Sequence, residues 1–301
     1  MIDVSNLKDT LKTLGFIAYG DIYEKVFSEI GCSLKVDFHA KKLIYPNEIK
    51  GRERNNGFDK KENFVVFECV CRLLSKGYRP EHIELEKEWH LGHDAKGGRA
   101  DICVSDTSGN MLFIIECKTW GREYDKALNN TKSDGAQLFS YWQQEQSCKW
   151  LVLYASDLKG GCIVHKASTI DCSDDANIIL LSKKDKSIKL YRDAHTTSAK
   201  YEAWKETYGS QIHDDLIFSE DSVAYQIGVK PLRKKDLRDF TPDDKIVNKF
   251  EEILRHNNVS DKENAFNRLV ALFICKLVDE STKNEDDEVE FQYKQGTDTY
   301  E

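Results

Sequence analysis

Three charged residues near the ends of two neighbouring apolar segments have types and spacing that could do chemistry. Asp101 follows Gly98-Arg99-Ala100, and Glu116 and Lys118 follow the apolar run Phe113-Ile114-Ile115. Glu116 and Lys118 are two residues apart, so in a strand their side chains share one face. Paired carboxylates hold Mg²⁺, a hard ion that prefers oxygen ligands, and an adjacent ammonium can orient a water and offset developing charge. The three residues therefore suit metal-assisted hydrolysis of a phosphodiester.

These residues can meet only if the segments that carry them form a hairpin. The sequence predicts strands at 100–105 and 111–118, joined by a turn at 106–110. Antiparallel pairing would bring both carboxylates to one edge of the sheet. Charge at the end of a buried strand is costly unless it serves a site, which favours a functional interpretation. The alternative is that Asp101 caps a turn while Glu116 and Lys118 are surface charges.

The remaining pattern predicts an α/β fold, a sheet with helices before, between and after its strands. Predicted helices cover 6–14, 21–30, 62–76, 124–146 with an interruption near 133–135, 244–255 and 262–279. Further predicted strands cover 83–89, 149–155, 162–164, 178–181 and 188–191, and 45–58 is a predicted loop. Beyond about residue 240 the sequence shows only helical patterns, those of the last two helices, so we expect a small all-α segment there.

Composition narrows the class of protein. The chain has 301 residues, of which 40% are hydrophobic and 11% aromatic, so it can bury a real core. No apolar run is long enough to span a membrane, and the N-terminus lacks the pattern of a secretory signal. Nine cysteines without a CxxC pair indicate reduced core thiols. We expect a soluble cytoplasmic protein with no membrane partner.

For some residues that could form a functional site, a purely structural role is the favoured interpretation. His90 and His93, with Asp94, lack a further clear ligand and favour a turn over a zinc site. Trp120 and Trp142 could stack on bases, although core packing is the favoured interpretation. The net charge of −8 does not exclude a nucleic acid, because a local basic segment is enough to contact phosphates. Two such segments lie at 41–61 and 230–238.

The motif residues resemble a known family of nucleases. Asp101 and the run Glu116-Cys117-Lys118 resemble the active-site signature of the PD-(D/E)xK nucleases. Gly98-Arg99-Ala100-Asp101 is similar to the G-x-A-D form found in type I restriction motor subunits and RecB-like nucleases. Gln137 and Tyr141 match the Q-x-x-x-Y element of that branch, and a spacing of four places them on one helical face. The resemblance covers residues 60–160.

The resemblance implies a restriction-endonuclease-like mixed sheet flanked by helices, and it implies roles for single residues. Asp101 and Glu116 would bind Mg²⁺, which Mn²⁺ can replace, and the backbone carbonyl of Cys117 would be a further ligand. Lys118 would position or activate the attacking water. Two residues of the Q-x-x-x-Y element, Gln137 and Tyr141, would orient the site and the scissile strand.

The family also places a glutamate early in its first core helix. Glu62 is the favoured candidate for this position, and Glu68 is the alternative. Both residues lie in the predicted helix at 62–76, and the sequence does not decide between them.

The C-terminal segment resembles a different family. Residues 250–266 and 298–301 are similar to the helical N-terminal domain of N6-adenine DNA methyltransferases of the type I modification-subunit class. Neither the F-x-G-x-G turn nor the NPPY-type motif of that family is present. We therefore predict a nuclease domain at 1–238 and a partial helical domain without methyltransferase activity at 239–301. The chain is expected to be a fragment of a longer restriction-modification protein.

The favoured hypothesis is a Mg²⁺-dependent endonuclease domain of a restriction-modification enzyme, acting on unmodified foreign double-stranded DNA. The basic segments 41–61 and 230–238 would contact phosphates without reading sequence. The other expected partners are the remainder of the polypeptide or cognate subunits, and SAM or ATP would be needed only by parts outside this chain. The alternatives are a non-cleaving DNA-binding or assembly module with a nuclease-like fold, and an RNA-directed or structure-specific nuclease.

Overall fold

A computed structural model describes residues 1–91, 95–106, 109–214, 216–219, 232–237, 262–287 and 289–292. The chain divides into two compact units, Met1–Tyr225 and Gln226–Glu301, whereas the sequence places a boundary after residue 238. The functions assigned to the two domains stay predictions. Several sequence-based assignments lie outside the described residues, namely the helix at 244–255, the methyltransferase-like residues 250–261 and 298–301, and the pair His93 and Asp94.

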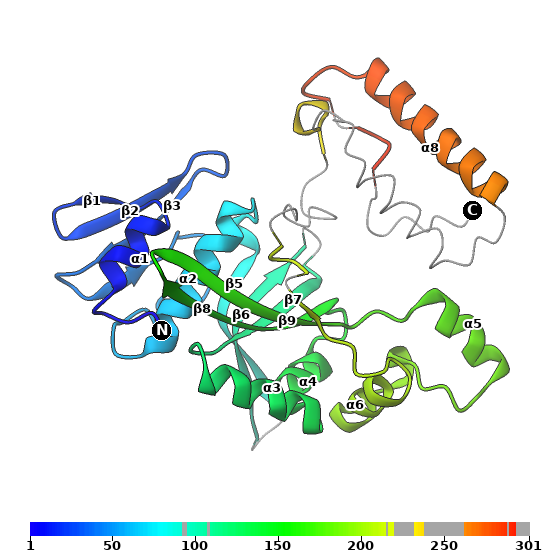
Figure 1. The fold of residues 1–301 in the computed structure, drawn as a ribbon, viewed down its shortest axis with the longest axis horizontal. Helices are drawn as coiled ribbons and strands as arrows, with labels where there is room; N and C mark the ends of the chain where they lie inside the picture. Colours follow the sequence, from blue (N-terminus) through cyan, green and yellow to red (C-terminus); the bar gives the residue numbers. More distant parts are fainter. Residues whose placement is uncertain are drawn as a thin grey trace. The chain divides into compact units, whose positions relative to one another are not determined.

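The first unit contains a six-stranded mixed sheet in the order β10-β9-β8-β7-β6-β5 (Figure 1). The strands are β5 (Ile83–Leu91), β6 (Ala95–Ser105), β7 (Met111–Cys117), β8 (Trp150–Lys159), β9 (Cys162–Asp171) and β10 (His213–Asp214). Neighbouring strands are antiparallel except for β7 and β8, which are parallel. A parallel pair needs a long crossover connection, and here it contains α3 (Arg122–Asp134) and α4 (Ala136–Gln144). The predicted α/β fold with a mixed sheet is confirmed.

Helices cover both faces of this sheet. Tyr154 in β8 reaches Glu68 of α2 (Lys61–Ser75), while its neighbour Leu153 packs in the core cluster that contains Leu138 and Phe139 of α4. Neighbouring residues of a strand point to opposite faces, so α2 and α4 lie on opposite sides of the sheet. The predicted break between two helices is present, because Gly135 has a left-handed φ of 78° that ends α3.

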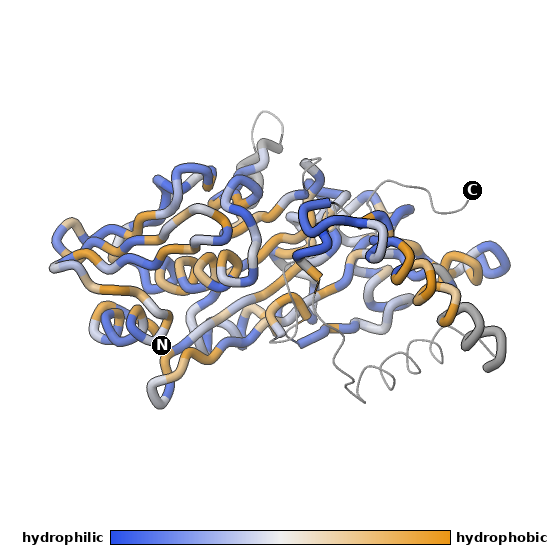
Figure 2. The backbone as a smooth tube through the Cα atoms, turned by 90° about the horizontal axis from the view of Figure 1, so that it is seen from above, coloured by the Kyte–Doolittle hydropathy of each residue, from blue (hydrophilic) through white to orange (hydrophobic). Residues whose placement is uncertain are grey.

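The helix α2 is apolar on most of its surface because it packs between two sheets, and Figure 2 colours most of it as hydrophobic. Besides the six-stranded sheet it contacts the N-terminal region, where the ring of Phe67 lies 5.8 Å from Phe16 and 5.4 Å from Tyr45. The second sheet is a four-stranded antiparallel meander that follows α1 (Leu7–Thr13). Its strands are β1 (Ile17–Tyr19), β2 (Ile22–Phe27), β3 (Cys32–Asp37) and β4 (Lys42–Ile44).

The predicted helix at 21–30 is wrong, because this segment is β2 and the turn that follows it. Apolar residues at 22, 23, 26 and 27 have the three- and four-residue spacing of a helix face. In the structure Tyr23 and Phe27 are buried, whereas Ile22 and Val26 are exposed. Pairing with β3 along the whole of β2, across the turn at 28–31, decides the outcome, and the periodicity of the segment by itself does not show this pairing.

Two predicted strands near the end of the first unit are also wrong. Residues 178–181 lie in the helix α5 (Ala176–Lys184), whose N-cap Asp175 accepts backbone N–H bonds from Asn177 at 2.8 Å and Ile178 at 3.1 Å. Residues 188–190 form neither a helix nor a strand, and Tyr191 begins a short 3₁₀ turn at Tyr191–Asp193. The helix α6 (Thr197–Glu206), which Thr196 caps, is not among the predicted helices.

The second unit contains the helix α8 (Lys262–Thr282), which confirms the helix predicted at 262–279. Lys235, from the basic segment 230–238, pairs at 2.5 Å with Asp286, which follows the end of α8. Of that segment, only residues 232–237 are described. Among the described residues, no helix is both long and apolar enough to cross a bilayer. All nine cysteines are free and seven of them are buried, in keeping with core thiols.

Candidate functional site

The predicted hairpin of β6 and β7 is present and brings the two candidate metal ligands together. The register pairs Ile102 with Ile115, and one further step along the strands places Asp101 opposite Glu116. The carboxylate of Asp101 accepts the backbone N–H of Cys117 at 2.7 Å, which holds it against the end of β7. Residues opposite one another in an antiparallel pair point to the same face, so the two carboxylates share one side of the sheet edge.

Lys118 links two carboxylates that come from distant parts of the chain. Its Nζ lies 2.6 Å from Oε1 of Glu116 and 3.2 Å from Oε1 of Glu62. Its backbone N–H donates to the carbonyl of Tyr154 at 2.8 Å, which continues the parallel pairing of β7 with β8. Glu62 reaches the ammonium from the first turn of α2. The structure thus gathers Glu62, Glu116 and Lys118 at one point.

Glu68, the alternative to Glu62, lies elsewhere. Its side chain is 1% exposed, and its two oxygens accept bonds from Arg72 Nη2 at 2.7 Å and from Tyr154 Oη at 2.7 Å. This buried network joins α2 to the face of β8 that carries Tyr154, and it does not include Lys118. Of the two candidate glutamates, only Glu62 contacts the cluster at the end of β7.

The helix α4 holds the second oxygen of Glu116. The hydroxyl of Tyr141 lies 3.0 Å from Glu116 Oε2 and 2.6 Å from the carbonyl of Arg99, and the amide of Gln137 donates to it. Tyr141 is fully buried and its ring stacks on Trp89, with centroids 5.4 Å apart. The four-residue spacing therefore places Gln137 and Tyr141 on the face that meets the carboxylate, as the sequence predicts.

Gly98 is a glycine because the ring of Tyr141 passes close to its backbone. A Cβ at this position would lie 2.5 Å from Cε1 and 3.0 Å from Cδ1 of Tyr141. The ring is buried between Trp89 and the strand β6, so it has little room to move aside. The glycine of the Gly98-Arg99-Ala100-Asp101 run thus permits the contact between α4 and β6 that orients Glu116.

Replacing Gly98 by Ala should destabilise the first unit by about 1–3 kcal/mol, because the added methyl overlaps the ring of Tyr141. Urea unfolding of the two single variants and of the double variant with Tyr141→Ala measures the effect. The double variant has space for the new methyl, so its loss of stability should be smaller than the sum of the two single losses. Additive losses would contradict this account of Gly98.

The site contains more negative than positive charge. Three carboxylates, of Glu62, Asp101 and Glu116, face the ammonium of Lys118. Burial, together with repulsion from Glu116 and Glu62, raises the pKa of Asp101 well above its ordinary value. Burial also raises the pKa of Glu116, although Lys118 opposes the shift. The carboxylates in turn raise the pKa of Lys118 against the effect of its own burial, so the lysine is held as a cation.

The donor set fits a Mg²⁺ ion. Mg²⁺ is bound by one or two carboxylates and keeps positions for waters and phosphate oxygens, which Asp101 and Glu116 would allow. Within the described residues, no three or more His, Cys, Asp or Glu side chains form a group that could hold a metal ion, so the protein would supply at most two side-chain ligands of this kind. Burial raises the pKa of the Cys117 thiol, so this side chain is a neutral thiol and only its backbone remains as a candidate ligand. A divalent cation would offset the excess negative charge between the two carboxylates.

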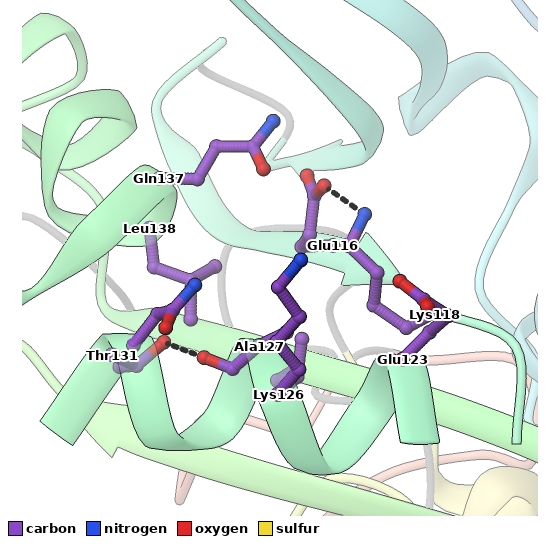
Figure 3. A pocket seen from close by; sticks show the side chains of 10 residues that line it. Glu116, Lys118, Glu123, Lys126, Ala127, Thr131, Gln137 and Leu138 are labelled. Atoms are coloured by element: carbon purple, nitrogen blue, oxygen red, sulfur yellow. Dashed lines mark hydrogen bonds and ion pairs between the residues drawn. The ribbon is translucent and has the colours of Figure 1, made fainter. Parts of the chain in front are cut away.

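A cleft of about 200 Å³ opens beside Glu116 and Lys118 (Figure 3). Its lining comes from β7 and the residue after it, from α3, α4 and β8. The lining residues are Glu116, Lys118, Glu123, Lys126, Ala127, Asn130, Thr131, Gln137, Leu138 and Leu153. The contribution of α3 cannot be predicted from the sequence, because a charged residue on a polar helix gives no sign of which cleft it faces.

One comparison with known proteins bears on this region. Residues 65–169 match the family model of the type I restriction enzyme R protein N terminus, and no curated protein matches the chain. The matched range contains Asp101, Glu116, Lys118, Gln137 and Tyr141, and it begins three residues after Glu62. This part of the chain is therefore similar to a domain of type I restriction systems, as its motifs predict. The nuclease motif and the methyltransferase-like C-terminal segment stay predictions.

Proposed function

We propose that this chain carries the Mg²⁺-dependent DNA endonuclease site of a restriction system. The observation that carries the proposal is the buried cluster of Asp101, Glu116 and Lys118 with Glu62, because its charge excess and oxygen donors suit a divalent cation. The family match supports the restriction system, since it spans the strands and the helix that build this cluster. In such a system the domain would act with the remainder of its polypeptide or with cognate subunits.

Each residue of the cluster has a part in the proposed reaction. Asp101 and Glu116 would hold the metal, which when bound would supply Lewis-acid stabilisation of the charge at the phosphate. Lys118 holds the attacking water near the phosphate and offsets charge on the oxygens. Tyr141 and Gln137 keep Glu116 in place through its second oxygen. Water adds across one P–O bond of the phosphodiester, which leaves a phosphomonoester and a hydroxyl.

The basic segment 41–61 is proposed to contact the backbone of the DNA. Part of its charge is already paired within the protein, since Arg54 lies 2.8 Å from Glu88 and Lys61 lies 3.6 Å from Asp3. Its remaining lysines would attract phosphates without reading sequence. The role of the segment 230–238 is likewise a proposal.

Cleavage of supercoiled plasmid and of an end-labelled duplex tests the proposed function. We expect nicking in Mg²⁺ or Mn²⁺ and none in EDTA, whereas Lys118→Met should cut at least about 100-fold more slowly. The assay is repeated with cognate modification and specificity subunits, because these can be required to place the DNA. A chain that binds DNA but cuts in neither metal under both conditions would be a non-cleaving DNA-binding module, and the proposed function would be wrong.

A further inference from the structure

A second group of cations lies next to the candidate site, around Trp120. This residue follows Lys118 by two positions, and its half-buried ring packs against the core cluster. The ammonium groups of Lys159 and Lys166 lie 4.2 Å and 5.0 Å from the centroid of its ring. One aromatic ring thus brings two like charges together, although a cation–π contact at an exposed site offsets little of their repulsion.

Little acidic charge compensates these two lysines. Asp125 lies 3.9 Å from Lys166, at the outer limit of an ion pair, and both side chains are about half exposed. Among the described residues, no carboxylate pairs with Lys159. An exposed ion pair at this distance contributes almost nothing to stability. An added anion would therefore stabilise the two neighbouring ammonium groups of Lys159 and Lys166.

The first turns of α3 connect this pair to the cleft. Asp125, which approaches Lys166, is followed directly by Lys126, which lines the cleft with Glu116 and Lys118. Figure 3 shows the side chain of Lys126 extending from α3 toward Glu116. No acidic side chain in the described part of the chain pairs with Lys126. Uncompensated lysines therefore lie on both sides of α3, from the cleft to Trp120.

The basic segment 41–61 is compensated only in part. Arg54 pairs with Glu88 at 2.8 Å, Arg52 with Glu53 at 3.4 Å and Lys61 with Asp3 at 3.6 Å. A lysine or arginine that already has a carboxylate partner gains less from a phosphate than one without such a partner. The three lysines around α3 differ from this segment in position, because Lys126 lines the cleft with Glu116 and Lys118 and Lys166 approaches Asp125 on the same helix.

We propose that Lys126, Lys159 and Lys166 form a phosphate-binding surface, the α3 lysine surface, which holds the backbone of a DNA strand as it passes the candidate cleavage site. Trp120 positions Lys159 and Lys166, and Lys126 contacts a phosphate within the cleft. Lysine ammonium groups bind phosphates as point charges, so the surface takes any sequence. The choice of DNA as the polyanion rests on the proposed function.

Binding of a labelled duplex in EDTA, over a range of salt concentrations, tests the α3 lysine surface without cleavage. The test variant is K126Q/K159Q/K166Q, and the control is K183Q/K184Q/K205Q, which removes the same charge from exposed positions of α5 and α6. We expect the test variant to bind at least about 10-fold more weakly in low salt, with a salt slope smaller by about 2–3. The control should stay within about twofold of the unmodified chain.

A second measurement reports on Trp120 directly. DNA should change the tryptophan fluorescence of the unmodified chain, and the change should be smaller in W120F. Equal weakening of both triple variants, an unaltered salt slope, or no DNA binding by the unmodified chain would overturn the α3 lysine surface. Cleavage in Mg²⁺ is scored separately, so a chain that binds DNA through these lysines but does not cut would reject the proposed function alone.

Discussion

Glu116→Gln should reduce Mg²⁺-dependent cleavage by about 10³-fold and leave the fold intact. Glutamine has the same shape and can still bond to Tyr141, but it removes the negative charge of a proposed metal ligand beside Asp101 and Lys118. Asp101→Asn should have the same effect, since its amide oxygen can still accept the N–H of Cys117. Burial raises the pKa of both acids, so neutralising either one should not destabilise the protein.

Calorimetric titration with Mg²⁺, cleavage assays and urea unfolding of each variant check this expectation. Glu29→Gln is the matched control, because Glu29 is exposed in the turn between β2 and β3, far along the chain from the cluster. Metal binding should be lost in Glu116→Gln and Asp101→Asn and retained in the control. Cleavage within about tenfold of the unmodified chain would show that these carboxylates do not hold the reacting metal.

Glu68→Ala should lower the free energy of unfolding by about 3 kcal/mol, the largest loss of stability expected here. The substitution leaves the guanidinium of Arg72 without its carboxylate and removes the acceptor of the Tyr154 hydroxyl. The side chain of Arg72 is only 21% exposed, so water replaces the lost partner incompletely. Glu68→Gln keeps the acceptor oxygen and should lose less, about 1–2 kcal/mol.

Glu62→Ala is the comparison within the same helix. The side chain of Glu62 is 37% exposed and its contact with Lys118 is 3.2 Å long, so we expect a change of less than about 1 kcal/mol. Under the proposed function Glu62→Ala should nevertheless slow cleavage, because the Glu62 carboxylate contacts the same Lys118 ammonium as Glu116 does. Urea unfolding and cleavage of both variants separate a structural glutamate from a functional one. Equal losses of stability would contradict the distinction.

Most elements around the site could be predicted from the sequence because their signals are local. The helix α2 is a continuous apolar segment that ends before Gly77, and β8 is an apolar run of the kind buried on both faces. The hairpin of β6 and β7 follows from two apolar segments separated by a polar turn. Where the prediction is wrong, as for β2 and α5, short apolar stretches suit both periods, and strand pairing or a cap decides between them.

The spacing of side chains by itself determined which residues share a face. Glu116 and Lys118 are two apart in a strand and Gln137 and Tyr141 four apart in a helix, and the periods of these elements bring each pair together. The hairpin then adds Asp101 opposite Glu116, because antiparallel neighbours meet across a turn. These relations depend only on backbone geometry and short separations along the chain.

Only the tertiary structure decided which residues from distant parts of the chain lie beside these pairs and Asp101. It brings Glu62 to Lys118 and Glu68 to Tyr154, because these two residues of α2 point in different directions. It brings Lys126 and Lys166 to the two sides of α3 and sets Gly98 against the ring of Tyr141. Such contacts depend on how helices pack across the sheet, and packing is a property of the whole core rather than of any single segment.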